Sequence, residues 1–318
     1  MRRRSFLGGA AVSLAAPAVL AQSWPARPIR VVVPLPPGSA ADAVPRAIAL
    51  RLQAALGVPC VIENKPGAAG AIGADTVAKA PPDGYTLLSH TSAIVIQPHL
   101  RPAPYDVLRD FAPIAQTIAG SYVLVAQPSF PANNLREFIA TVRRAPGRYS
   151  YGSYGSGSGP HLAMELLKRD AGLFILHVPF RGAAPALQEL LAGRLDMAFD
   201  TTFAAVPHIR AGRLKAIALG GPRAVDALPG VGTVAQLYPG FDTDGWQGFF
   251  APAGMPGDIV RTLADGIAKA LRDPELAATI TDLGFRPVGN TPEQFAAVVR
   301  ADHDKWGRVV RERRIRAD

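Results

Sequence analysis

Short apolar runs rich in β-branched residues alternate with longer alanine-rich runs of helical periodicity along almost the whole chain. The first series predicts strands at Ile29–Val33, Cys60–Glu63 and Thr86–Ser89, with helices at Ala40–Leu56 and Gly73–Lys79. Because strand and helix alternate, we expect an α/β protein with largely parallel sheets.

A second series of alternating elements begins after the apolar run Tyr122–Ala126. In chain order it predicts Leu135–Arg144 (helix), Tyr149–Gly152 (strand), Pro160–Ala171 (helix), Ile175–Pro179 (strand), Ala183–Ala192 (helix), Met197–Asp200 (strand), Ala204–Ala211 (helix) and Lys215–Leu219 (strand). Because the series restarts, we expect two similar lobes.

The C-terminal part of the chain returns to the first lobe and then becomes helical. Gly245–Ala251 is apolar and aromatic, which predicts a returning strand. Helices follow at Asp258–Leu271, Pro274–Leu283 and Pro292–Arg313. Thr291 favours the N-cap of the last helix, because a proline follows it at the first helical position.

Two glycine-rich loops, Pro36–Asp42 and Gly152–Gly159, stand where a predicted strand ends and a helix begins. At such a position the first backbone N–H groups of the helix are unpaired and favour a bound anion. The turns at Thr91–Ser92, Gly182–Ala183 and Asp200–Thr202 also follow strands. An ordinary strand-to-helix turn or a flexible surface loop is the alternative, and the residues alone leave both readings open.

No recognised catalytic or metal-binding motif accompanies these loops. The second loop lacks the lysine of a Walker A motif, Pro160 stands at the third glycine of G-x-G-x-x-G, and no serine in it has glycine at both i−2 and i+2. The six histidines lack the close spacing of zinc ligands. The single cysteine, Cys60, lies in an apolar run and cannot form an internal disulfide. We therefore expect no cofactor, no metal and no catalysis.

Residues 1–21 have the pattern of an export signal, with three arginines before the apolar run Phe6–Ala21. Arg3 and Arg4 resemble a twin-arginine signal, but Arg2 replaces the usual serine or threonine, so Sec export stays open, as does a retained N-terminal anchor. Removing the segment leaves 31 basic against 25 acidic residues, a net charge of +6. No basic stripe interleaves with aromatic residues, so we expect no nucleic-acid partner.

Short ordered motifs run through almost the whole mature chain. They are Trp24-Pro25 with Pro28-Ile29, the Pro-Gly loop ending at Asp42, Glu63-Asn-Lys-Pro-Gly67, Pro82-Asp-Gly-Tyr85, Pro104-Tyr105 with Asp110-Phe111, Tyr151-Gly-Ser153, His161-Leu162 with Glu165, His177-Val-Pro-Phe-Arg-Gly182, Gly193 with Asp196, Gly248 with Ala251-Pro252, and Thr291-Pro-Glu293 with Phe295. In this order they resemble the Bug/TctC family, the periplasmic solute receptors of tripartite tricarboxylate transporters.

The resemblance implies a two-lobed α/β fold of the type II periplasmic-binding-protein class. Two crossing strands, near Val123–Ala126 and Gly245–Phe250, would form its hinge. We assign residues 1–21 to the signal, 22–124 and 249–318 to the first lobe, and 125–248 to the second.

The resemblance also implies that loops of both lobes hold the carboxylate of a ligand. Carried over by position, the ligand-binding residues are Pro37, Gly38, Ser39, Ala40, Ala41, Thr91, Ser92, Ser153, Gly155, Ser156, Gly157, Ser158, Gly159, His161, Gly182, Ala183, Asp200 and Thr201. The chain departs from the family pattern at Ser39, which replaces the second of two adjacent glycines, and at Pro45 in the following helix.

The leading hypothesis is an exported, non-catalytic receptor, acting as a monomer, that captures a small organic acid or amino acid. Its partners would be the membrane permease subunits of a tripartite tricarboxylate transporter or a sensor kinase. The alternative is an exported α/β hydrolase acting on a small carboxylated substrate.

Overall fold

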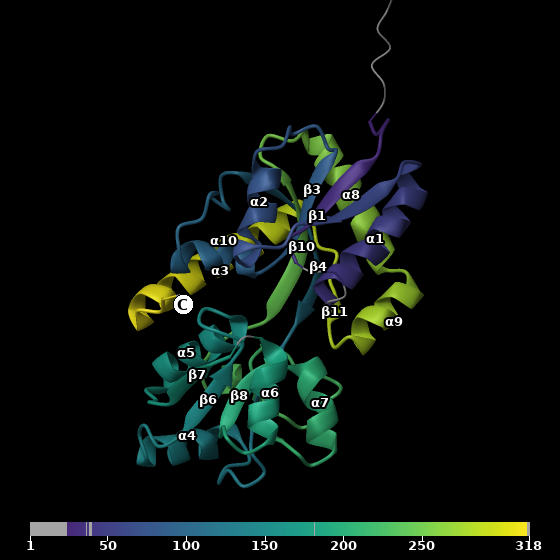
Figure 1. The fold of residues 1–318 in the computed structure, drawn as a ribbon. Helices are drawn as coiled ribbons and strands as arrows, with labels where there is room; N and C mark the ends of the chain where they lie inside the picture. The colour runs from purple at the N-terminus through teal and green to yellow at the C-terminus, as the bar shows by residue number, and fades with distance from the viewer. Residues whose placement is uncertain (1–23, 36, 38–39, 181, 317–318) are drawn as a thin grey trace, which may run out of the picture.

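The computed structural model describes residues 24–35, 37, 40–180 and 182–316, which form two lobes (Figure 1). Each lobe has a central sheet with helices against both faces. The predicted signal, residues 1–21, lies outside the described residues. Within the described part, no helix combines the length and apolarity needed to cross a membrane.

The first lobe is built on a six-stranded sheet of order β11-β4-β10-β3-β1-β2. These strands are β1 (Ile29–Val33), β2 (Cys60–Asn64), β3 (Thr86–Thr91), β4 (Phe111–Gly120), β10 (Gly245–Pro252) and β11 (Arg286–Pro287). The strands β1, β2 and β3 are parallel, whereas β10 runs antiparallel to both β3 and β4.

The second lobe is built on a five-stranded sheet of order β7-β6-β8-β5-β9. Its strands are β5 (Tyr122–Ala126), β6 (Ser150–Ser153), β7 (Leu176–Pro179), β8 (Met197–Thr201) and β9 (Lys215–Leu219). Here β6 pairs in parallel with β7 and β8, but β5 is antiparallel to β8 and β9. The expectation of largely parallel sheets is therefore wrong, because strands that carry the chain between the lobes run against their neighbours.

Ten α-helices are assigned among the described residues. They are α1 (Ala40–Leu56), α2 (Ala71–Ala78), α3 (Ala93–Leu100), α4 (Leu135–Arg144), α5 (Gly159–Ala171), α6 (Ala183–Leu191), α7 (Thr202–Arg210), α8 (Gly257–Leu271), α9 (Pro274–Asp282) and α10 (Pro292–Arg313). In the first lobe α1 and α8 cover one face of the sheet, and α2, α3 and α10 cover the other (Figure 1).

The chain crosses between the lobes at two adjacent places. The strand β4 ends at Gly120 and β5 begins at Tyr122, while the return passes through Asp244 into β10. The Ser121 hydroxyl donates a hydrogen bond to the Asp244 carboxylate, and this bond links the two crossings to each other. By strand pairing, residues 122–124 and 245–248 lie in the opposite lobes from those assigned to them by sequence.

The last helix also reaches from the first lobe to the second. Along most of its length α10 packs on β4 and α3, and near its end it meets α5. There Arg313 donates to the buried Glu165 at 2.9 Å, and Arg169 lies 3.3 Å from Glu312. The two crossings and this helix end therefore join the lobes, and the Thr202 hydroxyl of α7 adds a hydrogen bond to the Gly284 carbonyl of the first lobe at 3.3 Å.

Most predicted elements are present. The predicted bounds hold at both ends for β1, α1, α4, β9 and α10. Thr291 caps α10 as expected, and its partner Gln294 completes a capping box. Three of the described strands and α-helices were not predicted: β4, which contains Pro113, α3, a short apolar helix that contains Pro98, and the two-residue strand β11.

Candidate functional site

A cavity of about 270 Å³ lies between the lobes; we call it the cleft cavity. Its described lining is Ala41, Thr91, Ser92, Ala93, Ile96, Gln97, Ile118, Tyr122, Gly157, Ser158, Gly159, Thr201, Gly245, Trp246, Gln247 and Phe285. Seven of these residues were predicted from the sequence: Ala41, Thr91, Ser92, Gly157, Ser158, Gly159 and Thr201. The structure thus brings turns of both lobes to one place.

Helix N-termini converge on the cleft cavity. Ala41 lies in the first turn of α1, Ser92 is the N-cap of α3, Ser158 is the N-cap of α5 and Thr201 is the N-cap of α7. Each N-terminus carries a partial positive charge and unpaired N–H groups, and the dipole term alone stabilises an anion by ~0.3–1 kcal/mol. No residue of the described lining has a charged side chain. The cavity therefore suits an anion held by neutral donors.

Two buried polar atoms in this lining lack a partner among the described residues: the Ser158 hydroxyl and the Gln247 Oε1. The other end of the Gln247 amide donates to the Ala41 carbonyl at 2.7 Å and to the Ser89 hydroxyl at 3.1 Å. Since a buried polar atom without a hydrogen bond is costly, both atoms are candidates to bind a ligand.

A stack of three rings, Tyr151, His177 and His161, supports the loop Gly152–Gly159 on the side away from the cleft cavity. The Gly157 amide donates to His161 Nδ1 at 2.8 Å, and the Ser153 hydroxyl lies 2.6 Å from His177 Nε2. The rings of His161 and His177 stack at 3.9 Å, and Tyr151 continues the stack. His161 and Ser153 are buried and lie outside the described cavity lining, so they position the loop from outside the cavity.

The Ser153–His177 contact has the distance of a nucleophile and its base, which the sequence did not predict. However, Ser153 is completely buried, and its hydroxyl also lies 3.2 Å from both the amide and the carbonyl of Gly155. It does not line the cleft cavity as described. A nucleophile must reach its substrate, so this pair serves the loop and not catalysis.

Asp200 lies directly behind Thr201 and is almost fully buried. It accepts hydrogen bonds from the Tyr154 hydroxyl and from the Thr201 amide. Burial raises the pKa of Asp200 to about 6, although these hydrogen bonds act in the opposite direction. Asp200 therefore fixes the start of α7 without being part of the described lining.

The remaining predicted site residues divide into two groups. Pro37, Ala40, Gly155, Ser156, Gly182 and Ala183 belong to the predicted loops but not to the described lining of the cleft cavity. Gly38 and Ser39 lie outside the described residues.

The sequence missed the apolar walls of the cavity. Ile96 and Gln97 come from the unpredicted helix α3, and Ile118 comes from the unpredicted strand β4. Trp246 and Gln247 stand in the returning strand, which was predicted but not assigned to the site. The aromatic run around Trp246 was the signal that could have found them.

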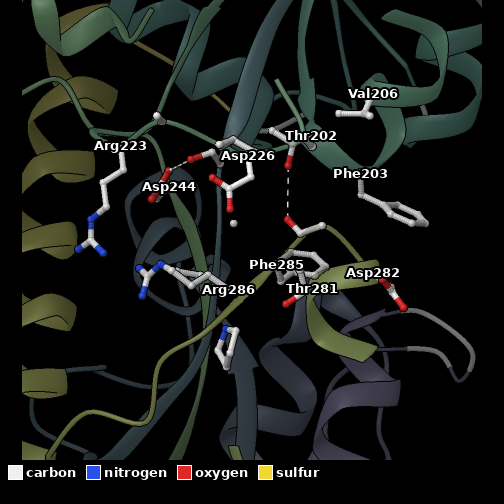
Figure 2. Close-up of a pocket in the computed structure, with 18 of the residues that line it drawn as sticks. Thr202, Phe203, Val206, Arg223, Asp226, Asp244, Thr281, Asp282, Phe285 and Arg286 are labelled. Carbon is white, nitrogen blue, oxygen red and sulfur yellow. Dashed lines mark hydrogen bonds between the residues drawn. The ribbon is translucent and has the colours of Figure 1, made fainter. Parts of the chain in front are cut away.

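A second cavity, of about 600 Å³, is called here the hinge cavity (Figure 2); of the predicted ligand loops and turns, only Thr202 belongs to its described lining. Residues of both crossings line it, together with α7, the end of α9 and β11. Although it is larger, its lining includes six charged side chains: Arg210, Arg223, Asp226, Asp244, Asp282 and Arg286. The cleft cavity, with its converging helix N-termini, is the better candidate for the principal site.

Comparison with known proteins identifies the family of the chain. Residues 44–315 match the family described as "Tripartite tricarboxylate transporter family receptor". The protein BugT of Bordetella pertussis is 36% identical, over 95% of this chain and 94% of its own length.

Three solved structures have the same architecture. A TctC solute-binding protein from Polaromonas without ligand has a TM-score of 0.83 at 28% identity, covering 91% of this chain and all of that one. An R. palustris protein with adipate has a TM-score of 0.76 at 32% identity, covering 92% of this chain and 99% of that one. MatC of Rhodopseudomonas palustris with bound malate has a TM-score of 0.71 at 32% identity, covering 90% of this chain and all of that one.

Proposed function

Because the chain belongs to the tripartite tricarboxylate transporter receptor (TctC) family, we propose that its cleft cavity captures a small carboxylate between the two lobes. Proteins of this family are periplasmic solute-binding proteins and not enzymes. The hydrolase alternative is therefore set aside.

The observation that carries the proposal is the convergence of helix N-termini from both lobes on a cavity whose described lining has no charged side chain. A carboxylate there accepts hydrogen bonds from backbone amides and hydroxyls that are already in place. Hydrogen bonds to a charged group contribute roughly 1.5–3 kcal/mol each. Several such bonds explain recognition of an anion without an arginine.

The walls of the cleft cavity favour a dicarboxylate. Ile96, Ile118, Trp246 and Phe285 supply apolar surface between the polar turns, which suits a short hydrocarbon segment between two acid groups. Two relatives of similar architecture hold dicarboxylates, adipate in one and malate in the other. The unpartnered Gln247 Oε1 can accept a hydrogen bond from a hydroxyl or amino group of the ligand.

Export and delivery complete the proposal. We place the mature N-terminus at or near Gln22, after the signal at 1–21, and expect a monomer in the periplasm. The loaded receptor would then meet the permease subunits of a tripartite tricarboxylate transporter or a sensor kinase. We propose lobe boundaries at Ser121 and Asp244, where the chain passes between the two sheets.

Calorimetry with matched ligands tests the carboxylate. Adipate, malate and other small acids are titrated into the mature protein, followed by the amide and methyl ester of the acid that binds best. We expect saturable one-to-one binding of an acid, with the amide and ester at least tenfold weaker, since tenfold corresponds to about 1.4 kcal/mol. Equal affinity for acid and amide would show that the cavity does not recognise a carboxylate. Turnover of an ester by the purified protein would revive the hydrolase.

A further inference from the structure

The hinge cavity lies on the opposite side of the two crossings from the cleft cavity. Gly120, Ser121 and Asp244 line the hinge cavity, whereas their chain neighbours Tyr122 and Gly245 line the cleft cavity. Because residues that are adjacent in the chain line different cavities at both crossings, the crossings form a wall between the two cavities. Phe285 lines both.

Two arginines from different lobes meet in the hinge cavity (Figure 2). Arg223 follows β9 of the second lobe, and Arg286 begins β11 of the first. Neither guanidinium has an ion pair or hydrogen bond among the described residues. Burial and then the charge of Arg223 lower the pKa of Arg286, which shows that the two cations repel each other.

The aspartates of the cavity compensate this repulsion only in part, because the charge of Asp244 raises the pKa of Arg286 by less than burial and Arg223 lower it. Asp244 is tied to Ser121, and burial raises the pKa of its carboxyl group. Asp226 is exposed and lies above Arg286 in Figure 2, without an ion pair in the described structure. An anion between Arg223 and Arg286 would relieve the repulsion and pair both charges.

The same cavity has an apolar side. Phe203 stands at the start of α7 with 51% of its surface exposed, and Val206 and Phe285 lie in the lining with it. Figure 2 shows Phe203 on the opposite side of the cavity from Arg223 and Arg286, so the cavity offers a cationic end and an apolar end to a ligand that is anionic at one end and apolar at the other.

We propose that the hinge cavity is a second ligand site, which binds an organic monocarboxylate with its acid group between Arg223 and Arg286 and its apolar body against Phe203. Both arginines are solvent-exposed, so the affinity is weak and falls with added salt.

Such a ligand would oppose capture in the cleft. Closure of the lobes on one side of the crossings separates the walls on the other side, and a carboxylate between Arg223 and Arg286 holds those walls together. By linkage, each ligand then weakens the other by the same factor. This step rests on the proposed function of the cleft cavity, whereas the second site itself does not.

Titration with benzoate and with inorganic phosphate at constant ionic strength tests the site. The parent should bind benzoate in a saturable way and more tightly than phosphate. R223Q and R286Q should each weaken benzoate binding at least fivefold, whereas R300Q, which removes an exposed arginine of α10 that has no ion pair among the described residues, should leave it unchanged. F203A should weaken benzoate but not phosphate, because it keeps the charges and the Cβ and removes the ring.

If benzoate binds in the cleft cavity instead, R223Q and R286Q will bind it as tightly as the parent does. That result would overturn the proposal, and so would the absence of saturable binding to the parent. If adipate binds the cleft, saturating benzoate should weaken it severalfold in the parent and not in R223Q. If no carboxylate binds the cleft, the proposed function fails, while the arginine variants still decide the second site.

Discussion

At the scale of single residues, several polar side chains act on the cleft cavity from behind its surface. His161 accepts a hydrogen bond from the Gly157 amide, and Asp200 accepts one from the Thr201 amide. His177 contacts the Ser153 hydroxyl. None of these three carboxylate or imidazole groups belongs to the described lining, yet each fixes a loop that does. Ligand affinity should therefore depend on groups that never touch the ligand.

Substitution of His161 separates its hydrogen bond from its ring. His161→Phe keeps the stack on His177 but leaves the buried Gly157 amide without an acceptor, at a cost of about 1–3 kcal/mol. We expect about tenfold weaker binding of the best cleft ligand by calorimetry. His161→Asn restores an acceptor near the position of Nδ1 and should recover most of that loss. If both variants bind alike, the amide bond does not position the loop.

The stability contribution of Asp200 should depend on pH. Its pKa is raised to about 6 in the folded protein from 3.8, so the folded state holds the proton more tightly. The stabilisation is fully present below about pH 4 and is lost as pH rises through 6. Asp200→Asn, which keeps an oxygen acceptor for Tyr154, removes this loss. Melting temperatures of the variant relative to the parent should rise from pH 4 to pH 7 and then level. A constant difference would contradict the raised pKa.

At the scale of elements, the sequence predicted those parts of the site that depend on local chemistry. Glycine loops between strand and helix were recognised because certain residue types favour positive φ angles and helix starts. Gly157 has a positive φ, which glycine adopts readily, and Gly159 begins α5. The walls depend on tertiary packing instead. The strand β4 and the helix α3 both contain proline and lack a clear period, so Ile118 and Ile96 could not be placed beside the loops from sequence alone.

The start of α5 is packed too tightly for any side chain at Gly159. A Cβ there would lie 2.2 Å from the Tyr122 hydroxyl and 2.8 Å from the carbon that bears it. Gly159→Ala should therefore lower the unfolding free energy by about 1–3 kcal/mol and weaken ligand binding. Tyr122→Phe removes the closest contact, so the double variant should be more stable than the sum of the single effects allows.

A matched control for this cycle is Gly257→Ala. Gly257 also begins a helix, but a Cβ there meets nothing closer than 3.4 Å. Its effect on urea unfolding should be small. Strict additivity of Gly159→Ala and Tyr122→Phe would show that the hydroxyl does not limit the space.

At the scale of the whole molecule, two adjacent crossings and the end of α10 join the lobes. Lobes joined at adjacent crossings can close as a hinge, and a ligand that binds the closed state better shifts the population toward it.

Binding in the cleft should therefore make the protein more compact. We expect a smaller radius of gyration by small-angle scattering when the best acid ligand saturates the protein. The methyl ester of the same acid, at the same concentration, should leave the radius unchanged. An unchanged radius with saturating acid would mean that the lobes are rigid or already closed.

Because the described lining of the cleft cavity has no charged side chains, the net charge of the complex reflects the number of acid groups on the ligand. Helix dipoles carry no net charge and release no proton, so each captured carboxylate adds one full negative charge to the complex. Native isoelectric focusing would then separate free receptor from loaded receptor by one step for a monocarboxylate and by two for a dicarboxylate. The receptor would report the number of acid groups on its cargo before the cargo is identified.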